Sequence, residues 1–159
     1  KVNLPSIFVK RLGEWDGSPT SLDTDGLCTN FLIAMLFDTD IFIWAQRGNV
    51  KAARLIDRSP ERFLSVFSYM ELLQSARDGE QHRRTHDFLS AFGFVVLPLT
   101  QNIGHRALIY VEEYSLSHGL RAGDAIIAAT AAENKMTLVS SNAKHFRPIK
   151  ELKLKVFKP

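Results

Sequence analysis

The sequence has only one cysteine, Cys28, so no disulfide can form within the chain. A single cysteine is typical of proteins from a reducing compartment. No apolar stretch approaches the roughly 20 residues that a membrane-spanning helix needs, and the longest candidate, residues 31–37, is far too short. The first residues also lack the basic, apolar and small-residue order of a signal peptide. We therefore expect a cytoplasmic protein with no membrane association.

The charge of the chain is basic but unevenly distributed. The 159 residues carry a net charge of +3, with 45% hydrophobic and 23% charged side chains, a composition ordinary for one globular domain. Residues 1–34 contain three basic and four acidic side chains, whereas the remainder contains 17 basic and 13 acidic ones. A basic surface suits a polyanionic partner such as RNA, although charge alone does not identify one.

The pattern of the sequence changes near residue 35. Residues 13–26 are rich in glycine, serine, threonine and proline and show little periodicity. From Met35 onward the hydrophobic pattern is dense and regular. We interpret residues 1–34 as an N-terminal extension (an upstream read-through or an added segment) and residues 35–159 as the folded domain.

Strand and helix patterns alternate throughout the predicted domain. Short apolar runs predict strands at residues 35–37, 63–67, 93–97, 137–140 and 152–157. Helical spacing predicts helices at residues 39–46, 50–57, 69–77, 80–92, 102–118 and 122–133. This alternation predicts an α/β fold with a central parallel sheet covered by helices on both faces. In such sheets the functional crevice lies beyond the carboxyl ends of the strands.

Three carboxylates lie where these elements meet that crevice. Asp38 follows the first strand, Glu71 lies three residues after Ser68 near the start of a helix, and Asp124 opens a helix of small residues. Each position has a simpler explanation on its own: Asp38 or Asp40 as a cap of the next helix, Glu71 as the capping-box partner of Ser68, and Asp124 as an acid favoured by the helix dipole.

Taken together, the three acids predict a metal site. Carboxylates brought to one sheet edge repel each other, and burial increases that repulsion, so a cation between them is favoured. Oxygen ligands select Mg²⁺ or Mn²⁺ over zinc. Such ions serve in phosphodiester hydrolysis, where they activate water and neutralise charge on the phosphate.

The strand at residues 137–140 brings further polar groups to the same edge. Ser140, Ser141 and Asn142 offer two hydroxyls and an amide oxygen that could support the acids, or they could form an ordinary polar turn. Lys144 and Arg147 follow, within a basic tail. These two side chains could contact RNA phosphates, or they could form an ordinary charged surface.

Four segments resemble, in order and spacing, the motifs of VapC-type PIN domains. They are Met35-Leu36-Phe37-Asp38-Thr39-Asp40, residues 65–72 (SVFSYMEL), residues 120–131 (LRAGDAIIAATA) and residues 138–146 (LVSSNAKHF). The resemblance implies a three-layer α/β/α fold around a parallel sheet. It also implies an Mg²⁺- or Mn²⁺-dependent endoribonuclease, the toxin of a toxin–antitoxin system, which forms a homodimer and is blocked by a cognate VapB-type antitoxin.

The resemblance assigns metal binding and catalysis to three residues: Asp38, Glu71 and Asp124. It assigns hydrogen-bonding support to Thr39. The fourth motif departs from the commonest pattern, because many relatives have an acid at the place of Asn142 or of His145. Asn142 can still offer a neutral oxygen to a metal, so both one and two metal ions stay open.

Several other interpretations compete with this one. Residues 37–40 (FDTD) also resemble the opening of HAD-like phosphatases, although the later paired aspartates of that family are missing. A receiver-like signalling domain needs an aspartate on a middle strand, and residues 93–98 have none. A non-catalytic PIN-like RNA-binding module is a third alternative. In the extension, residues 4–15 could imitate an antitoxin segment lying on the site, or could simply pack as a helix.

Overall fold

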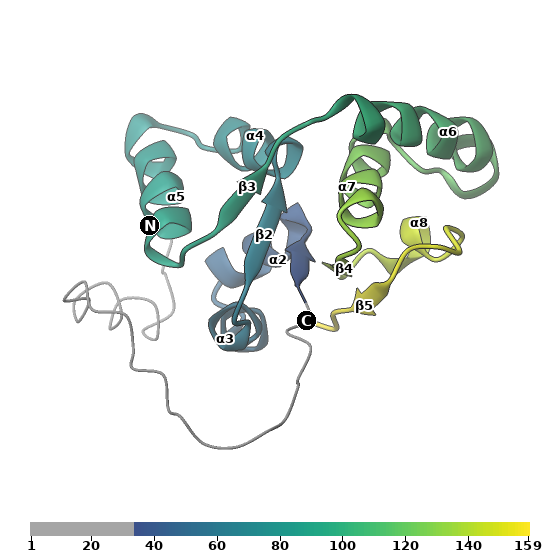
Figure 1. The fold of residues 1–159 in the computed structure, drawn as a ribbon. Coiled ribbons are helices and arrows are strands. Elements are labelled where there is room, and N and C mark those ends of the chain that lie inside the picture. The colour runs from purple at the N-terminus through teal and green to yellow at the C-terminus, as the bar shows by residue number, and fades with distance from the viewer. Residues whose placement is uncertain (1–33) are drawn as a thin grey trace, which may run out of the picture.

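The computed structural model describes residues 34–159, and the expectations for the extension lie outside these residues (Figure 1). Five strands form one sheet in the order β3-β2-β1-β4-β5, and every neighbouring pair is parallel. The strands are β1 (Met35–Phe37), β2 (Arg62–Ser65), β3 (Val95–Leu97), β4 (Thr137–Ser140) and β5 (Leu154–Val156). The predicted central parallel sheet is therefore confirmed.

Helices connect the strands. They are α2 (Thr39–Gln46), α3 (Val50–Arg58), α4 (Val66–Gln74), α5 (Gly79–Ala91), α6 (Gln101–His118), α7 (Ala122–Glu133) and the short α8 (Ala143–Phe146). The bounds of α2, α7 and β4 match the sequence prediction, whereas α8 was not predicted. Within residues 34–159, no helix is both long enough and apolar enough to cross a membrane.

The sheet separates two hydrophobic cores. Consecutive residues of a strand point to opposite faces, so Leu36 and Leu138 join the core under α6, α7 and α8. Phe37 and Val139 join the core under α2, α3 and α5. Helices on both faces of the sheet give the predicted three-layer α/β/α arrangement, which Figure 1 shows.

The start of α4 differs from the prediction. The second strand was expected to continue through Phe67, with Ser68 as the N-cap of the next helix; both expectations are wrong. Ser65 is the N-cap, because its hydroxyl oxygen accepts a hydrogen bond from the Ser68 backbone N–H at 2.9 Å. The helix therefore begins at Val66. Glu71 consequently lies in its second turn, where the helix dipole acts weakly.

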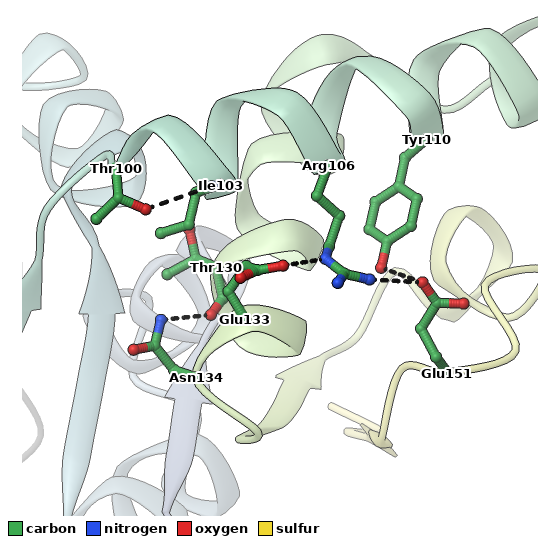
Figure 2. Close-up of polar contacts among 8 residues, drawn as sticks. All are labelled: Thr100, Ile103, Arg106, Tyr110, Thr130, Glu133, Asn134 and Glu151. Carbon is green, nitrogen blue, oxygen red and sulfur yellow. Dashed lines mark hydrogen bonds and ion pairs between the residues drawn. The ribbon is translucent and has the colours of Figure 1, made fainter.

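A polar cluster fixes α6 against its neighbours (Figure 2). The Arg106 guanidinium forms an ion pair with Glu133 on α7 and donates to Glu151 Oε1 at 3.0 Å in the segment before β5. The Tyr110 hydroxyl donates to the same Glu151 oxygen at 2.8 Å, and burial raises the pKa of Tyr110 to about 12. These bonds hold the last residue of α7 in place, while Asp124 occupies the first turn of that helix.

Candidate active site

Asp38 is fixed at the carboxyl end of β1. Its side chain is only 6% exposed, and it caps α2 through Oδ1, which accepts from the Thr39 backbone N–H at 2.7 Å. Oδ2 accepts from the hydroxyl of the fully buried Ser140 at 2.7 Å. The N-cap role that competed with a metal role is therefore real. It leaves each carboxylate oxygen with a second lone pair for another partner.

Thr39 links Glu71 to Asp38 through hydrogen bonds to both carboxylates. The Thr39 hydroxyl donates to Glu71 Oε2 at 2.5 Å, while the Thr39 backbone N–H donates to Asp38. The alternative that Glu71 completes a capping box with Ser68 is wrong, since Ser68 is not the N-cap. A half-buried glutamate held by a threonine at the strand ends is available to the site.

Asp40 was not among the candidate residues, yet it links two of the motifs. Its Oδ2 accepts from the backbone N–H groups of Ser141 at 2.8 Å and Asn142 at 3.1 Å, and from the Ser141 hydroxyl. Its Oδ1 is buried and has no hydrogen-bond partner among residues 34–159. The spacing Asp38-Thr39-Asp40, which puts the second acid in the first turn of a helix, was the signal that could have found it.

Asp124 is the third residue of α7 and is half-buried. The N-cap, Arg121, provides no side-chain hydrogen bond to the helix. The helix start is instead positioned by packing: a Cβ added at Gly123 would lie 2.5 Å from Cε1 of Phe67 on α4. Only glycine lets α7 approach α4 this closely, and that approach sets the position of Asp124.

The Gly123–Phe67 contact can be tested by stability. Alanine is ordinarily favoured over glycine in a helix by roughly 0.5–1 kcal/mol. Here we expect Gly123→Ala to destabilise the protein by about 1–2 kcal/mol, since a Cβ overlaps the Phe67 ring. In a Phe67→Ala background the same change should become stabilising. Urea unfolding of the four proteins measures both effects, and an unchanged sign in the two backgrounds would contradict the contact.

The electrostatics show that the acids lie close together. The pKa of Asp38 is raised from 3.8 to about 7, first by burial and next by the charge of Asp40, with a smaller contribution from Asp124. The hydrogen bonds from Ser140 and the Thr39 backbone oppose this rise. A buried carboxylate crowded by two others is stabilised in its charged form when a cation lies among them.

The donor set suits a hard cation, although the acids do not close a site by themselves. In the described part of the chain, no three His, Cys, Asp or Glu side chains form a ready metal-binding group. The groups at this edge are all oxygens, and the unpartnered Oδ1 of Asp40 adds an acceptor. Such a set fits Mg²⁺ or Mn²⁺, which bind few carboxylates and retain water.

The fourth motif lies at the same edge but points partly away from the acids. Asn142 is exposed, and its side chain does not cap α8. Lys144 and Arg147 are also exposed. His145 packs toward the end of α6, since its Cε1 would be 3.7 Å from a Cβ at Gly119, and its buried Nδ1 has no partner among residues 34–159.

Comparison with known proteins agrees with this architecture. The PIN domain family model matches residues 35–152. Ribonuclease VapC10 of Mycobacterium tuberculosis (strain ATCC 25618 / H37Rv) is 32% identical over 123 residues, which cover 75% of this chain and 90% of the relative. The chain belongs to the PIN domain family, and within it the chain is homologous to a VapC ribonuclease. The HAD-like alternative is not favoured.

Solved structures give the same fold. A toxin–antitoxin complex from Klebsiella pneumoniae has a chain that aligns with a TM-score of 0.64 at 30% identity, covering 75% of this chain and 95% of that one. VapBC2 from Rickettsia felis, bound to a DNA fragment from its promoter, aligns with a TM-score of 0.63 at 20% identity, covering 79% and 100%. The second likeness concerns the fold alone.

Proposed function

We propose that the protein is a divalent-metal-dependent endoribonuclease of the VapC toxin type, with Asp38, Glu71 and Asp124 as its catalytic and metal-binding residues. The observation that carries this proposal is the position of the buried Asp38 beside other acids at one sheet edge: burial raises its pKa to about 7, and the charges of Asp40 and Asp124 add to the rise. The ribonuclease named among the relatives supports the reaction class.

The position of each residue and its hydrogen bonds define its role in the proposed site. Asp38 is immobilised by the Thr39 backbone and by Ser140, so it would hold a metal ion without reorganising. Glu71 is oriented by the Thr39 hydroxyl, a support of the kind that tunes metal ligands. Asn142 can add a neutral oxygen. The chemistry that bound Mg²⁺ or Mn²⁺ supplies is activation of a water and neutralisation of charge on the phosphate.

Partners follow from the same proposal. Among the similar structures are a toxin–antitoxin complex from Klebsiella pneumoniae and the VapBC2 proteins of Rickettsia felis bound to a fragment of their promoter DNA. We propose a VapB-type antitoxin as the partner of this chain and RNA as its substrate. A homodimer in the cytoplasm is part of the proposal, and the exposed Val95 and Val96 on the edge strand β3, with Leu99 just after it, are suited to burial against a second subunit.

Metal removal tests the function. The purified full chain is expected to cleave RNA with Mn²⁺ or Mg²⁺, to lose this activity completely in EDTA, and to regain it when Mn²⁺ is added back. Gel analysis of purified RNAs measures the cleavage, and p-nitrophenyl phosphate serves as the control substrate. Turnover of that phosphate without RNA cleavage would instead support the phosphatase alternative.

A further inference from the structure

An open groove of about 720 Å³ lies beside the candidate site. Its lining begins at Ser141 and Asn142, whose backbone N–H groups donate to Asp40. It continues along α8 and past the end of β5 to Lys158, and His118 at the end of α6 also lines it. A molecule lying in the groove would therefore reach the edge of the sheet where the acids converge.

The groove is cationic. Lys144, Arg147 and Lys158 line it and are exposed, and its lining contains no aspartate or glutamate side chain. Within residues 34–159, none of these three cations forms an ion pair. Their charges are therefore available to a ligand. The exposed side chain of Val156 adds apolar surface to the same lining.

We propose that this groove binds the sugar–phosphate backbone of single-stranded RNA next to the bond that is cleaved. The inference rests on the proposed ribonuclease function. Three cations without an ion pair among residues 34–159 can neutralise phosphates of a strand, and the exposed Val156 in the same lining can contact sugars or bases. An RNA chain in the groove would continue toward Asp38, Glu71 and Asp124. One part of the strand would then bind the cations of the groove, and the adjacent part would lie at the acids.

A second groove provides a matched control. It has a volume of about 390 Å³ and is also basic, with Lys51, Arg54 and Arg58 in its lining. It includes Met35, the first residue of β1, and therefore lies at the edge of the sheet opposite Asp38. Removing three charges there changes the net charge as much as removing three beside the acids.

The experiment compares two triple variants of the full chain. One is Lys144→Gln, Arg147→Gln, Lys158→Gln, and the other is Lys51→Gln, Arg54→Gln, Arg58→Gln. Fluorescence anisotropy in EDTA measures their binding of labelled single-stranded poly(U) over a range of salt. For three lost phosphate contacts, the slope of log affinity against log salt should fall by about 2 in the first variant, and affinity should fall roughly ten- to a hundredfold. The second variant should bind like wild type.

Cleavage kinetics give a second measurement. The first variant should lose activity more through KM than through kcat, as expected when binding away from the reacting bond is weakened. Equal losses in the two variants, or unchanged RNA binding in the first, would overturn the inference. Weaker binding of an antitoxin peptide with unchanged RNA binding would assign the groove to a protein partner. If wild type cleaves no RNA, the proposed function fails, whereas the binding comparison still tests the groove.

Discussion

Asp38→Asn is expected to reduce RNA cleavage by a factor on the order of a thousand or more, since the proposed metal site would lose a charged ligand. The fold should survive, because asparagine is as good an N-cap as aspartate and can accept the same bond from the Thr39 N–H. Asp124→Asn should abolish cleavage in the same way. Full activity in either variant would refute the site assignment. Asp87→Asn, an exposed acid on α5, is the control and should leave cleavage unchanged.

The same change at Asp38 should also stabilise the metal-free protein at neutral pH. The pKa of Asp38 is raised from 3.8 in the unfolded chain to about 7 in the folded one, so folding favours the protonated carboxyl. The stabilisation that the protonated Asp38 gives to the folded protein is fully present below about pH 4. It declines as the pH rises through 7 and is lost above that. In EDTA, the Tm of wild type should fall relative to Asp38→Asn across this window. An equal pH dependence in the two proteins would contradict the burial argument.

Arg62→Ala is expected to lower the free energy of unfolding by about 3 kcal/mol, as three hydrogen bonds from a charged group are lost. The Arg62 guanidinium donates to the backbone carbonyls of Ile56 at 2.7 Å, Asp57 at 2.9 Å and Phe92 at 2.9 Å. It therefore ties the C-terminal turn of α3 and the end of α5 to β2. The alanine side chain cannot replace these three bonds, so the contacts that hold the two helix ends to β2 are lost.

Thermal unfolding measures this effect. A loss of about 3 kcal/mol corresponds to a fall in Tm of roughly 10 °C for a chain of this size. Arg62→Lys keeps the charge but not the planar set of donors, and it should recover only part of the loss. Arg54→Ala, an exposed position on α3, is the control and should change stability by less than about 0.5 kcal/mol. A Tm for Arg62→Ala within the range of that control would show that the three bonds contribute little.

Much of the fold could be predicted from local signals. The bounds of α2 and α7 were found because the caps, periodicity and small residues agreed. The start of α4 was missed because Ser65 and Ser68 are equally good N-caps, and the intervening Val66 and Phe67 favour strands when read locally. Tertiary packing decides instead: Phe67 lies against Gly123, far along the chain. The four residues of α8 are too few to show helical periodicity.

The elements that meet at the candidate site could be predicted, and so could Thr39, Ser140 and Ser141 as residues that support its acids, but the pairing of individual atoms could not. Parallel topology alone brings Asp38 and the residues after β4 to the same edge. The pairing of Ser140 with Asp38, however, joins positions 102 residues apart, and no local pattern encodes it. The hydrogen bonds of Asp40 likewise come from distant residues, at the end of β4 and directly after it, so the local Asp38-Thr39-Asp40 spacing alone did not show which atoms it binds. Sequence spacing identifies the elements that meet, while side-chain geometry decides which atoms pair.

The central position of β1 has a consequence for synthesis. β1 lies between β2 and β4, so the strand that precedes Asp38 is translated long before its second neighbour in the sheet, β4. Until Thr137–Ser140 has been translated, Asp38 lacks its bond from Ser140, and Asp40 lacks those from Ser141 and Asn142. A nascent chain that stops before β4 therefore cannot assemble the complete acidic edge, however well its earlier elements have folded.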